Sequence, residues 1–90
     1  MPAEFGPKKD AANIRKHSVS LAEGDGVLND PLALTVEDVA AEGEQRFVTI
    51  GMNTFGSMMV VIHTPRGRGS RVISVRKADP TERTDYEKNL

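Results

Sequence analysis

The side chains that could perform chemistry gather in residues 46–78, which contain five arginines, one lysine and no carboxylate. Arg66 precedes the last predicted strand and Arg76 lies near its end. Guanidinium groups beside a flexible, glycine-flanked turn can grip a phosphate with two hydrogen bonds each. The pattern therefore predicts an anion site in which Arg66 and Arg76 are the main phosphate contacts. Further cations that could contact the same ligand are Arg46, Arg68 and Arg71.

Groups able to move protons accompany these cations. His63 carries an imidazole, whose ordinary pKa suits proton transfer near neutral pH, and Tyr86, Lys77 and Glu44 are further candidates. RNA cleavage without a metal needs a base near the 2′-hydroxyl, cations on the pentavalent phosphorane and a proton donor for the leaving 5′-oxygen. The segment could supply all three, and it leaves the general base open among these four residues.

Each of these residues also has a simpler interpretation. Arginines such as Arg68 and Arg71 often blunt the edge of a sheet while remaining solvated. A single histidine at the end of a strand, such as His63, can be structural, and Tyr86 can anchor a polar helix by packing. Spacing alone therefore makes a ribonuclease one hypothesis and a non-catalytic binding module another.

The charges are segregated along the chain, although the formal net charge is only −1. Residues 1–45 hold four Lys/Arg against nine Asp/Glu, whereas residues 46–90 hold eight against four, so the halves are near −5 and +4. A positive surface on a rigid sheet suits phosphate. Because the overall charge is negative, we expect weak unspecific affinity for RNA.

Composition limits the remaining possibilities. Ninety residues predict one domain, 1–90, with a shallow surface site. Without cysteine there is neither a disulfide nor a thiolate metal site, and His17 and His63 alone do not make a zinc site, so we expect no metal and no cofactor. The longest apolar run, residues 58–62, is far shorter than a membrane span. These features predict a cytoplasmic protein with no membrane partner.

The first half of the chain predicts two helices and a strand. Residues 7–17 form a helix that starts at a proline and ends in cations. Ser20 and Glu23 have the spacing of a capping box, which predicts a second, short helix from Leu21 that its glycines weaken. Residues 32–36 alternate as a strand, and an acidic loop follows.

The second half predicts a meander of three strands, residues 46–50, 57–64 and 70–77. The unbroken apolar run within the second strand predicts that it is central and buried on both faces. Strict alternation in the last strand places Val72, Ser74 and Arg76 on one face and Arg71, Ile73, Val75 and Lys77 on the other.

A final helix is predicted to begin after Asp79 and to end near residue 88. Because it has little apolar surface, we expect it to be mobile or to be completed by another chain. The fold class is therefore α+β, with a small antiparallel sheet of three to four strands, two N-terminal helices and a C-terminal helix.

Several motifs, in order along nearly the whole chain, resemble the BrnT toxin family. They include Glu82-Arg83 and Tyr86-Glu87 in the last helix and, before them, residues 12–17 (ANIRKH), 29–35 (NDPLALT), 42–51 (EGEQRFVTIG) and 71–78 (RVISVRKA). The resemblance implies a RelE-like fold and a ribonuclease that halts translation. By position, it favours Arg66, Arg76, Lys77 and Tyr86 as site residues, with second choices at His63, Glu44 and Arg46.

The resemblance also implies partners. These are an RNA substrate and a BrnA-like antitoxin with a ribbon-helix-helix part, through which alone the toxin would reach operator DNA. Phe5-Gly6-Pro7 stands where the family usually has Trp-Asp-Pro. The alternative is accordingly a weakened or inactive toxin homologue that binds its antitoxin in operon regulation.

Overall fold

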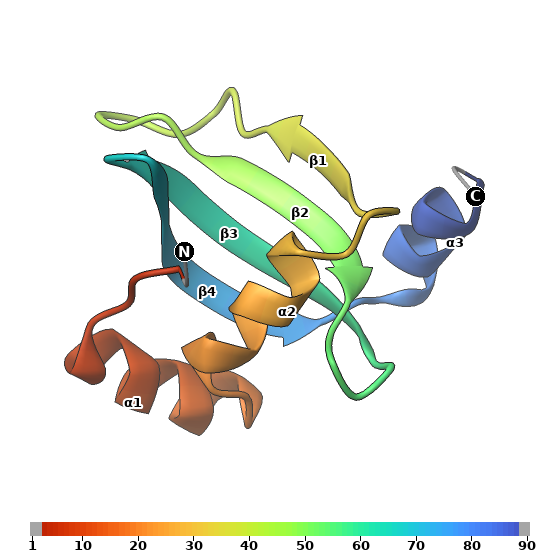
Figure 1. The fold of residues 1–90 in the computed structure, drawn as a ribbon, viewed down its shortest axis with the longest axis horizontal. Helices are drawn as coiled ribbons and strands as arrows, with labels where there is room; N and C mark the ends of the chain where they lie inside the picture. The colour runs from red at the N-terminus through yellow and green to blue at the C-terminus, as the bar shows by residue number, and fades with distance from the viewer. Residues whose placement is uncertain (1–2, 89–90) are drawn as a thin grey trace.

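The computed structural model describes residues 3–88. One antiparallel sheet holds the strands in the order β1-β2-β3-β4. Helices α1 and α2 lie on one face of the sheet, and α3 lies at one end of it (Figure 1). This arrangement confirms the predicted α+β class. The elements in chain order are α1 (Pro7–His17), a 3-10 turn (Leu21–Glu23), α2 (Gly24–Leu28), β1 (Leu34–Glu37), β2 (Phe47–Met52), β3 (Met58–Arg66), β4 (Gly69–Lys77) and α3 (Pro80–Lys88).

The main core lies between the sheet and the two N-terminal helices. Apolar side chains from the helical segment pack against Met59 and Val61 of β3 and against Val72 and Val75 of β4. On the opposite face of β3, Val60 packs with Ile50 and with Tyr86 of α3. Strand β3 therefore contributes to both faces, which confirms its prediction as the central, doubly buried strand.

The prediction that side chains alternate strictly between the two faces along β4 is wrong, because a β-bulge interrupts the strand. His63 pairs with Val72, whereas the preceding residue of β3, Ile62, pairs with Ser74, so Ile73 is the extra residue. The bulge shifts the period by one position. Val72 and Val75 consequently enter the same core, and Arg71 joins Ser74 and Arg76 on the other face of the sheet.

The N-terminal elements match their predicted positions with local differences. Helix α1 has the predicted bounds and ends at Ser18, which has a φ of 60°. The predicted second helix is a 3-10 turn followed by α2. Ser20 caps it, but the Glu23 carboxylate accepts a 2.9 Å hydrogen bond from Asn53 Nδ2 instead of returning to the cap. Glu4 forms an isolated parallel bridge with Arg71.

The C-terminal helix starts as its sequence predicts. Glu82 N–H donates to Asp79 Oδ1 at 2.8 Å, and Asp79 N–H donates to Glu82 Oε1 at 2.9 Å, so the two residues form a capping box. Tyr86 is the buried residue of α3, with 4% of its surface exposed. Within residues 3–88, no helix has the length and apolar character needed to cross a membrane.

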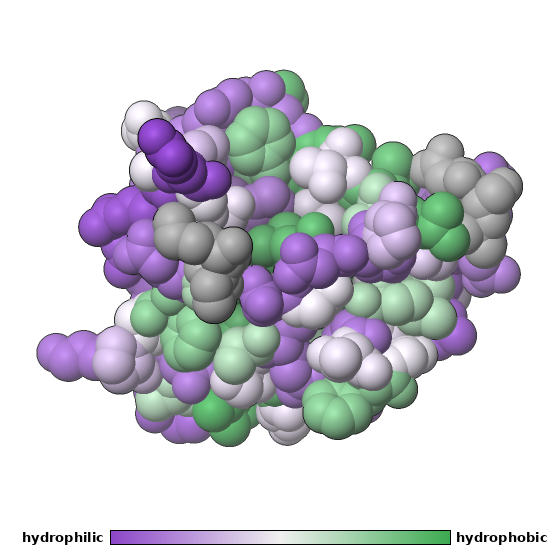
Figure 2. All heavy atoms as spheres, in the orientation of Figure 1, coloured by the Kyte–Doolittle hydropathy of each residue, from purple (hydrophilic) through white to green (hydrophobic). Residues whose placement is uncertain are grey.

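The helix-bearing side of the molecule mixes polar and apolar residues. Figure 2 shows hydrophilic and hydrophobic patches interspersed over this side. No broad apolar area dominates it in that view. On the opposite side of the sheet, the strand register arranges the side chains in rows across the strands.

Candidate nucleic-acid interface

The face of the sheet opposite α1 and α2, here called the open face, consists of cross-strand rows. One row contains Ile50, Val60 and Arg76, and Tyr86 of α3 packs on its apolar part. The next row runs from Val36 through Val48 and Ile62 to Ser74, and Val36 is 54% exposed. Helix α3 thus covers one end of the face and leaves an apolar strip beside it.

Arginines stand on both sides of this apolar strip. Arg76 lies in the row that α3 covers, and Arg71 lies opposite Thr64 in the row on the other side. Arg46 immediately precedes β2, and the two-residue period places it on the same face as Val48. Its Nε lies 3.6 Å from Glu44 Oε1. The open face therefore presents cations around apolar side chains, with one exposed carboxylate beside Arg46.

Arg76 is held in place by α3. Its Nη1 and Nη2 donate hydrogen bonds of 2.8 and 2.7 Å to the two oxygens of Glu82. This bidentate pair raises the pKa of Arg76 and lowers the pKa of Glu82, although burial acts against both shifts. The same carboxylate belongs to the capping box with Asp79, so the start of α3 fixes the orientation of the guanidinium.

Tyr86 is anchored by Asp30, a residue that the sequence did not indicate as part of the site. The phenol donates a 2.8 Å hydrogen bond to Asp30 Oδ2, which also accepts from Met52 N–H at 2.8 Å. This hydrogen bond is the largest cause of the raised pKa of Tyr86. Burial alone would raise the pKa of Asp30, but hydrogen bonds from Met52, Leu32 and Tyr86 lower it.

His63 lies on the helix-bearing face, away from the open-face arginines. It is 8% exposed, and its Nε2 lies 2.7 Å from Thr49 Oγ1, which is itself 2.8 Å from Thr35 Oγ1. The ring stacks on Phe47 with a centroid distance of 5.9 Å. Burial lowers the pKa of His63 below its ordinary value of 6.5. A shallow hollow beside Pro65 and Ser70 reaches the ring.

The remaining predicted residues lie at the two ends of the sheet. Arg66 and Arg68 are exposed in the β3–β4 hairpin, where Gly67 has a φ of 56° and Arg66 Nε lies 3.9 Å from Glu4 Oε2. Lys77 is exposed at the opposite end, in a hollow that Arg83 also lines. The strand register thus places Arg46, Arg71 and Arg76 on the face opposite His63. The Arg71 guanidinium lies at the outer edge of β4, where its Nη2 would be 3.8 Å from a Cβ on Gly6.

The fold and the open face define a small α+β domain with a cationic sheet surface suited to an extended anionic ligand. Comparison with known proteins identifies the family. A model of the ribonuclease toxin BrnT of type II toxin–antitoxin systems matches residues 5–82. The chain therefore belongs to the BrnT family and is a ribonuclease toxin of a type II toxin–antitoxin system.

A solved structure supports this assignment. The chain resembles the 1.1 Å crystal structure of the Brucella abortus ribonuclease toxin BrnT, with 26% sequence identity and a TM-score of 0.67. The match covers 88% of this chain and 97% of the Brucella chain. No curated protein sequence matches the chain significantly.

Proposed function

We propose that the protein is a metal-independent endoribonuclease that cleaves RNA on the open face. Cleavage in the cytoplasm arrests translation, and a BrnA-like ribbon-helix-helix antitoxin neutralises the toxin. Operator DNA is reached only through that antitoxin. The family assignment supports the ribonuclease class and the presence of an antitoxin, and the open face supports the location of the RNA.

The main support for placing the RNA on the open face is the apolar strip with arginines on both sides. Bases and riboses can pack on Val48 and Ile62, while Arg71 and Arg76 contact phosphates on either side of them. Arg46 adds a third cation to this face, and Arg66 and Arg68 extend the positive surface into the hairpin. Such an arrangement recognises a single strand, whose bases are free to stack.

We assign Arg76 to stabilisation of the pentavalent phosphorane, because its bidentate pair with Glu82 orients it in advance of binding. Glu44 is too far from Arg76 to be the general base at the same phosphate. Its carboxylate lies beside Arg46, which is four residues along β2 from the row of Arg76, or about 13 Å. His63 and Tyr86 are buried in hydrogen bonds to Thr49 and Asp30. Lys77 follows Arg76 directly on β4 and pairs with Met59, so its side chain points to the opposite face of the sheet and does not act on the same phosphate.

The test is cleavage of RNA in the presence of a metal chelator. Wild type should cleave, and Arg76→Lys should reduce kcat by about 10²-fold while preserving a cation at the site. Arg15→Ala, which removes an exposed arginine from α1, is the matched control and should keep full activity.

Two results would contradict this proposal. Loss of wild-type cleavage on chelation would contradict metal independence. Unchanged activity of Arg76→Lys would contradict the location on the open face. Thermal unfolding of each variant separates a loss of chemistry from a loss of fold.

The alternative function is a non-catalytic module that binds the antitoxin. One observation favours it: Arg76, Tyr86 and His63 are all engaged by other side chains of the protein. Under this alternative, induced expression without antitoxin leaves growth and cellular RNA unchanged, while the folded protein still binds the antitoxin. Growth arrest with RNA degradation supports the enzyme instead.

A further inference from the structure

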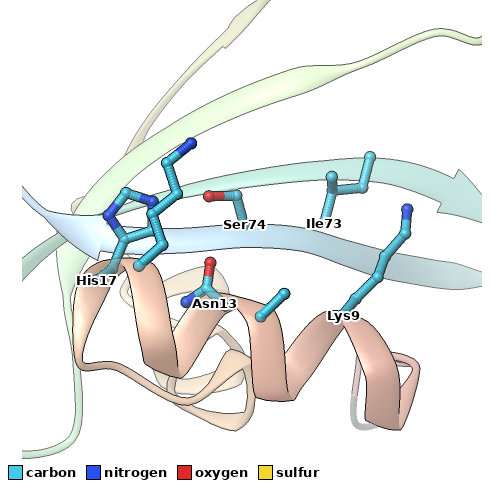
Figure 3. A pocket seen from close by; sticks show the side chains of 7 residues that line it. Lys9, Asn13, His17, Ile73 and Ser74 are labelled. Carbon is cyan, nitrogen blue, oxygen red and sulfur yellow. The ribbon is translucent and has the colours of Figure 1, made fainter.

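A groove lies outside the open face, between α1 and the outer edge of β4. Its volume is about 270 Å³, and Lys9, Lys16, His17, Ile73 and Ser74 are among its lining residues. Figure 3 shows Lys9 and His17 at opposite ends of the helix, with Ile73 and Ser74 on the strand beside it. The groove therefore follows the length of α1.

The groove is positively charged. Lys9 and Lys16 are exposed and lie two helical turns apart, which separates them by about 10 Å along the helix axis. No carboxylate lines the groove, and within residues 3–88 neither lysine forms an ion pair. Asp10, the acidic residue of α1, instead accepts hydrogen bonds from Ser20 and Leu21, at 2.9 and 2.7 Å.

The floor of the groove is apolar, and Asn13 satisfies the outward-facing backbone groups of the neighbouring Val75. Ala12 of α1 and Ile73, the extra residue of the β-bulge, form the apolar part. Asn13 Nδ2 donates to Val75 O at 2.8 Å, and Asn13 Oδ1 accepts from Val75 N–H at 3.2 Å. This side chain occupies the strand edge, so the groove does not offer β4 for pairing with another strand at Val75.

Ser74 connects the groove to the open face. It lines the groove, and it also ends the row that contains Val48 and Ile62. A single strand that lies along the apolar row and passes over Ser74 consequently arrives between Lys9 and Lys16. The partly buried ring of His17 offers a surface on which a base can stack.

We propose that this groove binds the phosphodiester backbone of single-stranded RNA where the strand leaves the open face. The inference rests on the proposed ribonuclease function and extends its substrate contacts. Lys9 and Lys16 contact phosphates, and Ala12 and Ile73 support the ribose or base between them. Continuity with the open face through Ser74 favours RNA over an acidic protein segment as the occupant.

The experiment measures binding of a 2′-O-methyl RNA oligonucleotide, which cannot be cleaved through its 2′-oxygen. The test variant is Lys9→Gln/Lys16→Gln. The control is Lys8→Gln/Arg15→Gln, which removes the same charge from adjacent positions of α1 that do not line the groove. The test variant should bind about tenfold more weakly, and its slope of log affinity against log salt should fall by about 1.4, as expected for two lost contacts to a single strand. The control should change much less.

Equal weakening of both double variants would overturn the proposal, because it would show a general charge effect. Loss of antitoxin binding with unchanged RNA affinity in the test variant would also overturn it, in favour of an acidic protein segment. If wild type neither binds nor cleaves RNA, the proposed ribonuclease itself fails. If wild type cleaves RNA and the test variant binds normally, only the groove assignment fails.

Discussion

The hydroxyl of Tyr86 donates a 2.8 Å hydrogen bond to Asp30, which lies 56 residues earlier in the chain. This contact joins α3 to the turn before β1. The ring of Tyr86 simultaneously covers Ile50 and Val60 of the sheet. Because Tyr86 is the buried residue of α3, the helix is attached to the domain mainly through this side chain and through Glu82.

Removing only the phenolic hydroxyl tests whether Tyr86 is an anchor or a catalytic acid. Tyr86→Phe keeps the ring and leaves Asp30 with its two backbone donors, so we expect a loss of about 1 kcal/mol in the free energy of unfolding. The melting temperature should fall by about 4–8 °C. RNA cleavage at a temperature where the variant is folded should match wild type. A large loss of kcat in folded Tyr86→Phe would show that the hydroxyl participates in catalysis.

The Arg76–Glu82 pair should make stability depend on acid pH. The bidentate hydrogen bond lowers the folded-state pKa of Glu82 below its ordinary value of 4.5. Its stabilisation is therefore present above pH 4.5 and is lost as the pH falls through the folded-state pKa. Denaturant unfolding should show that Glu82→Gln is less stable than wild type at pH 7. Its free energy of unfolding should also decrease less than that of wild type as the pH falls below 4.5. An equal decrease in the free energy of unfolding below pH 4.5 in Glu82→Gln and wild type would contradict this assignment.

His63 should contribute a second pH dependence at higher pH. Burial lowers its folded-state pKa below 6.5, so the unfolded chain binds the proton more readily. The stabilisation is complete above pH 6.5 and declines as the pH falls, by at most about 1.4 kcal/mol per pH unit. NMR titration of the imidazole should give a midpoint below 6.5. A midpoint at or above that value would contradict the burial argument.

Local sequence signals were sufficient for several elements of the fold. The proline at the start of α1 and the Asp79–Glu82 capping box act within one helical turn, so their effect could be read from neighbouring residues. The apolar run of β3 identified the central strand for a similar reason. The arginines were identified by type, but strict alternation assigned Arg71 to the wrong face.

The remaining features depend on partners that are distant in sequence. No glycine or proline marks Ile73 as a bulge, because the irregular pairing arises against β3. Asn13 bonds to the backbone of Val75, 62 residues later, and Tyr86 finds Asp30 across most of the chain. Such contacts form only when the sheet is assembled, so neither residue's own neighbourhood predicts its role.

Gly24 is another residue whose role depends on contacts distant in sequence, and its substitution provides a further test. As a glycine it weakens α2, and alanine would improve helix propensity by about 1 kcal/mol. A Cβ at this position, however, would lie 3.2 Å from Val75 Cγ2 and 3.3 Å from both γ-carbons of Val72. Both valines are fully buried, and both γ-carbons of Val72 are close, so rotating one methyl away brings no relief. Overpacking of this kind costs about 1–3 kcal/mol and outweighs the gain in propensity.

Gly24→Ala should therefore lower the melting temperature, by roughly 4–8 °C for a net loss of about 1 kcal/mol. Gly69→Ala is the matched control, because its Cβ would meet only the Arg66 carbonyl oxygen, at 4.0 Å. That control should leave the melting temperature within a few degrees of wild type. A higher melting temperature for Gly24→Ala would show that helix propensity outweighs packing at this position, and that α2 can move away from β4 without a large loss of stability.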